Sequence, residues 1–203
     1  MIQLFTKFLK NWSRKMDKEK ILEEIAEEIR RCEECKKNKF GLAVPGKGNA
    51  NAKILFLGEA PGPQESKKGE PFIGPSGKFL DFLLDLARIK REEVFITSPV
   101  KYYPGKRAPT EEEIRHGMLH TSKQIEAINP KLIVVLGNVA LKALFPDKKL
   151  KISEIHGSVI KKDKRIYFLT FHPSAGRRFP QIKKKMVEDF KKLRKIKKVI
   201  SLK

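Results

Sequence analysis

Short apolar runs recur along the chain and predict strands that are buried on both faces of a sheet. Each run is four or five residues long. Glycine, proline or polar residues bound each run, which is typical of a central strand. The predicted strands are Lys53–Leu57, Val94–Thr97, Leu132–Leu136 and Ile166–Thr170.

Apolar residues spaced three or four apart predict helices around these strands. In the first helix, for example, Ile25 and Ile29 lie on one face. Thr110, followed three residues later by Glu113, matches a capping box at the start of another helix. The predicted helices are Lys18–Arg31, Lys78–Ile89, Glu111–Ile128, Ala140–Phe145 and Glu188–Lys198.

The alternation of strand, loop and helix predicts an α/β fold. We expect a three-layer α/β/α sandwich with a central four-stranded, mainly parallel sheet. Residues 18–203 would form this single domain, preceded by a basic N-terminal arm of residues 1–17. Ligands of such sheets bind at the carboxyl ends of the strands. The loops Gly58–Gly77, Ser98–Arg107 and His172–Phe179 should therefore converge on one site.

The charge of the chain favours a polyanionic partner. Lysine and arginine number 45 against 24 acidic residues, giving a formal net charge of +21. Such a field attracts nucleic-acid phosphates. The alternative is a thermophile's lysine-rich surface, although that adaptation usually raises glutamate together with lysine.

No apolar run reaches 18 residues, so we expect no membrane partner. The absence of a heptad run or a long apolar edge strand predicts a monomer. We expect an intracellular, prokaryotic protein associated with the nucleoid. Gln3 and Phe8 leave a sliding clamp open as a partner of the N-terminal arm.

The loop that follows the first strand is rich in glycine and proline but matches neither glycine-rich phosphate-binding template. Its prolines remove amide donors and stiffen the backbone, which suits the binding of a flat ligand. The same loop carries Phe72, whose ring can stack on such a ligand. His172 follows the fourth strand and can donate to a ligand oxygen.

Together these segments resemble the uracil-DNA glycosylase superfamily, and within it family 4, the thermostable and archaeal type. The resemblance runs from Cys32 to about Leu193. It rests on several landmarks that occur in order: Gly58–Gly62 with Glu65, Pro71–Lys78, Pro109-Thr110, Leu136-Gly137 and His172–Ala175.

The resemblance implies particular roles for residues of the predicted site. Glu59 and His172 would be catalytic: Glu59 lies near the attacking water, and His172 donates to the uracil O2. Gly58, Ala60 and Phe72 would bind the base, with Phe72 stacking on it. From the residues alone, Phe72 can equally be a core residue, Glu59 a cap or ion-pair partner, and His172 a structural cap.

The resemblance also places a DNA surface beside the base. The segment Ala175–Phe179 would press into the DNA helix. Arginine is well suited to phosphate contacts, although the two arginines in that segment can also be plain surface residues. The expected DNA-binding residues are Lys101, Arg107, Ser174, Arg177 and Arg178.

The implied activity is excision of uracil from DNA, double- or single-stranded, by a monofunctional glycosylase that leaves an abasic site. One departure from the family affects the base: Ser98 stands where the family has an asparagine. A hydroxyl cannot satisfy both the N3 and O4 groups of uracil as an amide does. A glycosylase for another deaminated base such as hypoxanthine, or a non-catalytic DNA-binding module, therefore remains an alternative.

The second departure concerns a [4Fe–4S] cluster that the family usually holds on four cysteines. Cys32 and Cys35 match the first pair, but Tyr102 and Gly117 occupy the other two positions. Because this cluster ordinarily requires four thiolates, we expect no cofactor and interpret the pair as a remnant. His116 and His120 lie near the lost fourth position, so a zinc site with Cys32, Cys35 and one histidine stays open.

Overall fold

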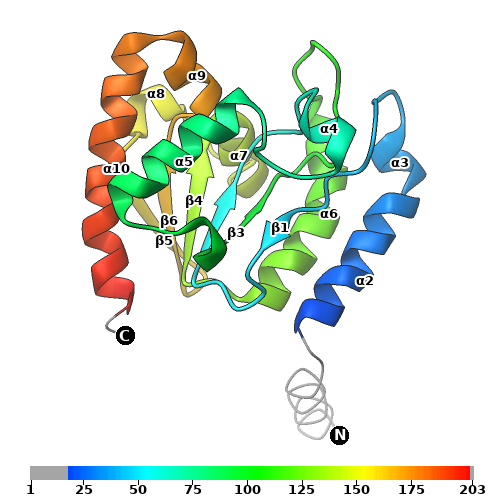
Figure 1. Cartoon of the computed structure of the whole chain (residues 1–203), viewed down its shortest axis with the longest axis horizontal. Coiled ribbons are helices and arrows are strands. Elements are labelled where there is room, and N and C mark those ends of the chain that lie inside the picture. Colours follow the sequence, from blue (N-terminus) through cyan, green and yellow to red (C-terminus); the bar gives the residue numbers. More distant parts are fainter. Residues whose placement is uncertain (1–17, 202–203) are drawn as a thin grey trace, which may run out of the picture.

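The computed structural model describes residues 18–201, with side chains as far as Lys198 (Figure 1). The predicted arm of residues 1–17 lies outside the described residues. The described strands form one six-stranded sheet in the order β1-β3-β2-β4-β6-β5. They are β1 (Lys47–Gly48), β2 (Ile54–Leu57), β3 (Val94–Thr97), β4 (Leu132–Leu136), β5 (Val159–Lys162) and β6 (Arg165–Thr170).

The four central strands are parallel and correspond to the four predicted ones, which confirms the expected core of the sheet. Every residue of β2, β3 and β4 is buried. Leu57 at the end of β2 pairs with Thr97 and Val135, so the carboxyl ends of neighbouring strands lie level. The loops that leave these ends therefore start from one edge of the sheet.

Helices cover both faces of the sheet, so the three-layer sandwich is also confirmed. Figure 1 shows α5 in front of the sheet and α7 behind it. The helices are α2 (Lys18–Arg31), α3 (Glu33–Lys36), α4 (Glu65–Lys68), α5 (Pro75–Ala87), α6 (Glu111–Ile128), α7 (Gly137–Leu144), α8 (Ile152–Ile155), α9 (Pro173–Arg178) and α10 (Pro180–Ser201), with a 3-10 turn η1 at Arg91–Glu93.

Two groups of helices make the outer layers. Helices α5, α9 and α10 contact one another, and Phe190 of α10 stacks on Phe56 of β2 with ring centroids 6.4 Å apart. Helices α2 and α6 pack together, and α6 also contacts α7. The capping box predicted for α6 is present, with Thr110 and Glu113 bonded to each other's backbone. Among the described helices, none combines the length and the apolar character needed to cross a membrane.

The two edge strands were not predicted, so the sheet has six strands among the described residues rather than the expected four. Both β1 and β5 pair antiparallel to their neighbours. They are short and largely exposed, and therefore lack the apolar run that marked the central strands. The β5–β6 turn places Asp163 and Lys164 at positive φ without a glycine, so it also lacks the usual hairpin signal.

Several helices begin or end away from their predicted bounds. Helix α5 starts at Pro75, because proline suits the first helical turn, and ends where Arg88 adopts a left-handed conformation. Helix α10 starts well before Glu188: its lysine-rich first turns still place Met186 in the core. The segment after His172, predicted as a loop, is the short helix α9.

Candidate active site

The three predicted loops meet at the carboxyl ends of the central strands, as expected. They enclose a cavity of about 350 Å³. Each loop supplies polar lining residues: Glu59 and Glu65 come from the loop after β2, Ser98 and Arg107 from the loop after β3, and His172 from the segment after β6. Gly58 lies directly behind the Phe72 ring rather than on the cavity wall.

Phe72 and His172 face the same cavity. Their ring centroids are 5.7 Å apart, with an interplanar angle of 41°. Phe72 also packs against the hydrophobic core, as its structural interpretation expects; stacking on a base stays a prediction. Phe72 therefore contacts both the hydrophobic core and the cavity.

The backbone of Phe72 is held in an unusual conformation. Its φ is +52°, in the left-handed region that non-glycine residues rarely adopt. The Arg91 guanidinium donates to the carbonyl oxygens of Pro71 and Phe72 at 2.9 and 3.0 Å. At Gly58, a Cβ would lie only 2.7 Å from the Phe72 ring. Sequence reasoning missed Arg91, because a surface-like Glu/Arg turn gives no sign of this contact.

Glu65 organises the loop after β2 from within. Its carboxylate accepts hydrogen bonds from the backbone N–H groups of Gly62, Ile73 and Gly74, at 3.1, 2.9 and 2.7 Å. These bonds tie the two limbs of a long loop together, so they hold the segment before Phe72 against the segment after it. The sequence singled out Glu65 only as a landmark of the resemblance.

His172 presents a defined ring nitrogen to the cavity. The backbone N–H of Ser174 lies 3.3 Å from Nδ1, and the Ser174 hydroxyl lies 2.8 Å from it. Because a backbone N–H can only donate, Nδ1 is the acceptor and the ring proton resides on Nε2. Burial lowers the pKa of His172 to about 4, so the ring is neutral at pH 7.

The position of His172 depends on a glycine in the neighbouring strand end. Gly137, at the start of α7, has a φ of +87°, and a Cβ there would meet the His172 Cβ at 2.8 Å. His172 is also the N-cap of α9. The cap therefore uses Nδ1 and leaves the Nε2–H group for a ligand.

Glu59 and Ser98 are the other polar groups that the sequence assigned to the base. Burial raises the pKa of Glu59 above its ordinary value. The buried Ser98 hydroxyl donates to the Val100 carbonyl oxygen at 2.8 Å, which commits its hydrogen to the backbone. Ser98 is among the residues that line the cavity.

Lys101 does not belong to a DNA-binding surface, so that expectation was wrong. The side chain is 1% exposed. Its ammonium donates to Thr97 Oγ1, Gln124 Oε1 and the Pro45 carbonyl oxygen, at 2.9, 3.1 and 3.3 Å. Burial lowers the pKa of Lys101 to about 7. The sequence cannot distinguish a buried lysine from an exposed one in such a loop, because the difference lies in the direction of the side chain.

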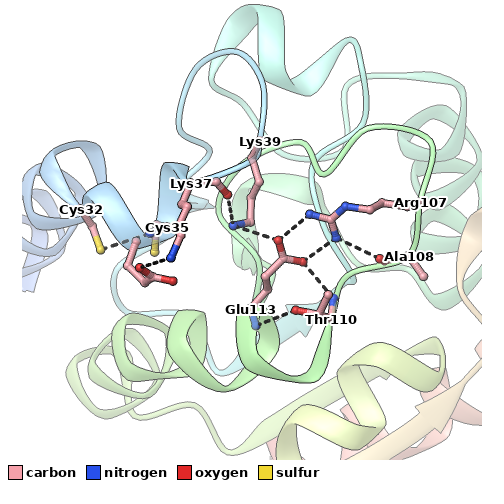
Figure 2. Close-up of polar contacts among 9 residues, drawn as sticks. Cys32, Cys35, Lys37, Lys39, Arg107, Ala108, Thr110 and Glu113 are labelled. Atoms are coloured by element: carbon pink, nitrogen blue, oxygen red, sulfur yellow. Dashed lines mark hydrogen bonds and ion pairs between the residues drawn. The ribbon is translucent and has the colours of Figure 1, made fainter.

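The remaining basic residues of the predicted DNA surface lie at or near the cavity. Arg107 and Arg178 line it together with Ser174, and Arg177 is exposed on α9 beside them. Arg107 is held by a two-pronged pair with Glu113, at 2.6 and 2.8 Å. Lys39 approaches the same carboxylate at 3.1 Å, and Figure 2 shows Glu113 between these two cations.

The two cysteines lie close in space to two histidines that are far from them in the sequence. The ligand atoms of Cys32, Cys35, His116 and His120 all lie within 4.8 Å of one another. Cys32 Sγ and His116 Nε2 are 3.1 Å apart. Burial raises the pKa of Cys35 to about 12 and lowers that of His120. The sequence raised one histidine as an extra ligand; the structure brings both near the cysteines.

The four-cysteine cluster implied by the resemblance does not fit these residues. The Tyr102 hydroxyl donates to the Arg30 carbonyl oxygen at 3.1 Å, and its ring is buried. At Gly117, a Cβ would lie 1.8 Å from the Pro99 carbonyl oxygen, which leaves no room for a thiolate. Only two of the four expected thiolates are therefore present.

Comparisons with known proteins identify the family of the chain. The model of the uracil DNA glycosylase superfamily matches residues 45–194. A type-4 uracil-DNA glycosylase of Saccharolobus solfataricus is 41% identical over 184 residues, covering 85% of this chain and 85% of that protein. Those of Archaeoglobus fulgidus and Thermotoga maritima are 38% and 36% identical, over 85% and 86% of this chain and 91% and 94% of their own lengths.

The fold and the cavity define a class of protein: an α/β/α sandwich whose strand ends place an aromatic ring and a neutral imidazole around a space the size of a small ligand. Such pockets suit a base that has left the DNA stack. The chain belongs to the uracil DNA glycosylase superfamily.

Proposed function

We propose that this chain is a monofunctional DNA glycosylase that hydrolyses the N-glycosidic bond of uracil in DNA and leaves an abasic site. The observation that carries this proposal is the meeting of Phe72 and His172 in one cavity. The names of the type-4 relatives support uracil as the base. No lysine lines the cavity among the described residues, which supports hydrolysis without strand cleavage.

The first task of the site is to hold a flipped base. Extruding a nucleotide from the duplex costs a few kcal/mol. Stacking on an aromatic side chain returns about 1–3 kcal/mol per base, and Phe72 offers a ring already fixed by Arg91 and the core. Because the ring does not have to be ordered when the base binds, the stacking energy is available to offset the cost of extruding the base.

The second task is to stabilise the departing base. When the bond between N1 and C1′ breaks, its electron pair moves onto the uracil ring and a cationic sugar remains. The neutral His172 donates its Nε2–H to the O2 atom, where negative charge grows during the reaction. A fixed donor of this kind is worth about 3 kcal/mol in the transition state.

The third task is delivery of water to C1′. The carboxylate of Glu59 orients this water, accepts its proton and stabilises the sugar cation. Burial favours the protonated form of Glu59, as its raised pKa shows, and so makes it a stronger base than an exposed carboxylate. The atoms balance: water oxygen bonds to C1′, and the base leaves with the electron pair.

Ser98 gives a partial readout of the base edge. Its hydroxyl hydrogen is bound to the Val100 carbonyl, so its oxygen acts as an acceptor. Uracil carries a hydrogen at N3 and can donate to that oxygen, whereas cytosine has no hydrogen there. The Ser98 hydroxyl cannot donate to the uracil O4 at the same time. We therefore propose selection of uracil over cytosine with a smaller margin than an asparagine provides.

The DNA strand would lie across the cavity mouth. Arg107 and Arg178 would contact its phosphates, together with Arg177 and Ser174; the position of Arg107, Arg178 and Ser174 in the cavity lining and the exposure of Arg177 support this role. The net charge of +21 supports a salt-sensitive grip on either single- or double-stranded DNA. We propose a monomeric domain of residues 18–203 that acts on chromosomal DNA, with residues 1–17 as an arm for a partner such as a clamp.

A panel of labelled oligonucleotides tests the proposal. Each carries one uracil, hypoxanthine or cytosine, in single strands and in duplexes, and is treated with alkali after incubation. We expect alkali-dependent cleavage at uracil, none without alkali, and none at cytosine. Cleavage at hypoxanthine but not uracil would assign the other substrate. Binding without cleavage of any oligonucleotide would identify a non-catalytic module.

A further inference from the structure

The four cysteine and histidine side chains come from two separate segments that the fold brings together. Cys32 lies between α2 and α3, Cys35 lies in α3, and the two histidines lie one turn apart on the same face of α6. A tetrahedral zinc ion, with bonds of about 2.0–2.3 Å, places its ligand atoms about 3.3–3.8 Å apart. The observed limit of 4.8 Å needs only small inward movements to meet that spacing.

A second observation points to a ligand at this place. His120 is 4% exposed, and neither of its ring nitrogens has a hydrogen-bond partner. Such an orphaned buried ring is uncommon in a folded protein. Glu28 Oε1 lies 3.4 Å from Nδ1, without forming a hydrogen bond with it. A metal ion bound at Nε2 would satisfy one nitrogen and orient Nδ1–H toward Glu28, the arrangement typical of metal-bound histidine.

We propose that Cys32, Cys35, His116 and His120 bind a single zinc ion, in a site that replaces the four-cysteine cluster. Two thiolates and two imidazoles form a complete tetrahedral set for zinc. A cluster with two cysteines and two histidines carries the histidines on a different iron from the cysteines. Here Cys32 Sγ lies 3.1 Å from His116 Nε2, so a thiolate and an imidazole meet at the same ion.

The site is accessible to an ion from solvent. A groove between α2 and α6, with a volume of about 1070 Å³, opens onto Cys32, His116 and His120. Glutamates of α2 line the same groove, including Glu24, Glu27 and Glu28. Lys20, Arg31 and Lys123 line the groove as well, so its four glutamates exceed its cations by one charge. Of the four proposed ligands, Cys35 is the one that does not line this groove.

The ion would fasten α2 and α3 to α6 beside the base cavity. From Cys35 the chain continues to Lys39, which reaches Glu113 on α6 (Figure 2). It then runs to Val44, which lines the base cavity. The zinc site and the Glu113 contacts thus hold the same segment at two points. Its role is structural, because none of its four ligands lines the base cavity.

The experiment begins with the intact protein. Metal analysis of the purified chain should find zinc at one ion per chain, without iron or acid-labile sulfide. After chelation, titration with cobalt should produce the visible absorption of a tetrahedral cobalt–thiolate complex. This readout needs no variant, so it holds even if a variant fails to fold.

Variants then assign the ligands. His120→Ala should abolish zinc binding, while His120→Cys should retain it, because a thiolate replaces the imidazole. Glu28→Ala should weaken zinc affinity about 10- to 100-fold by removing the acceptor that faces Nδ1. Leu119→Ala, on the same helix and lining the same groove, is the matched control and should bind zinc like the original chain.

Three outcomes would overturn the proposal. One is a chain that takes up neither zinc nor cobalt. Another is iron with labile sulfide, which would show a cluster on an altered ligand set. The third is cobalt spectra unchanged in His120→Ala, since the orphaned ring would then have no part in the site.

Discussion

The base cavity and the cysteine–histidine group lie in the same domain but depend on their residues in different ways. In the cavity, Phe72 and His172 occupy the positions that the resemblance implies, and Gly58 and Gly137 leave the space that the Phe72 ring and the His172 Cβ need. In the cysteine–histidine group, only two of the four cysteines implied by the resemblance are present, and His116 and His120 lie beside them. Atoms that contact a transition state have few substitutes, whereas a structural cross-link needs only that two segments be joined.

Removing His172 should have the largest effect. We expect His172→Ala to lower the single-turnover rate of uracil excision about 100- to 1000-fold, because one fixed donor to O2 is lost. DNA binding should stay within about threefold, since the phosphate contacts come from other residues. Single-turnover kinetics and fluorescence anisotropy measure the two effects. An unchanged rate would remove His172 from the mechanism.

Crowding the Phe72 ring should have the next largest effect. In Gly58→Ala, the new methyl group would lie 2.7 Å from the ring, so Phe72 must move. A displacement of about 1 Å costs up to about 100-fold in a positioned reaction, and we expect a 10- to 100-fold slower excision. The control is Leu119→Ala, which changes an exposed side chain of α6 that does not line the cavity. If Gly58→Ala reacts as fast as the original chain, the base does not stack on this ring.

The sequence predicted the pocket better than it predicted the second region, for a physical reason. Buried parallel strands and glycine-rich turns have strong local patterns, so the central strands and the converging loops were found. The edge strands, the burial of Lys101 and the support from Arg91 depend on side-chain direction and on distant partners. His116 and His120 carry no local signal that separates a ligand from a polar helix face.

Chelation separates the two regions from each other. If the cysteine–histidine site is structural, removal of zinc should lower Tm while the excision rate of the folded protein changes less than about threefold. A loss of about 2–3 kcal/mol corresponds to a fall of about 4–12 °C for a domain of this size. Calorimetry and kinetics well below Tm measure both quantities. A rate that collapses while Tm stays constant would mean that the metal serves the reaction.

Glu113 joins the two regions, and its removal should have the smallest effect. The cations of Arg107 and Lys39 hold the pKa of Glu113 at about 2, below its ordinary value. A carboxyl whose pKa is lowered by folding stabilises the folded state above its unfolded pKa of about 4.5, and this stabilisation is lost as the pH falls toward 2.

Glu113→Gln should therefore lower Tm by a few degrees at pH 7, and the difference from the original chain should shrink below pH 4.5. Glu112→Gln, one position earlier on the exposed side of α6, is the control and should have little effect at either pH. If the Glu113→Gln difference persists unchanged at pH 3, its origin is packing rather than charge. The link between Lys39 on the cysteine side and Arg107 at the cavity rim would then not be electrostatic.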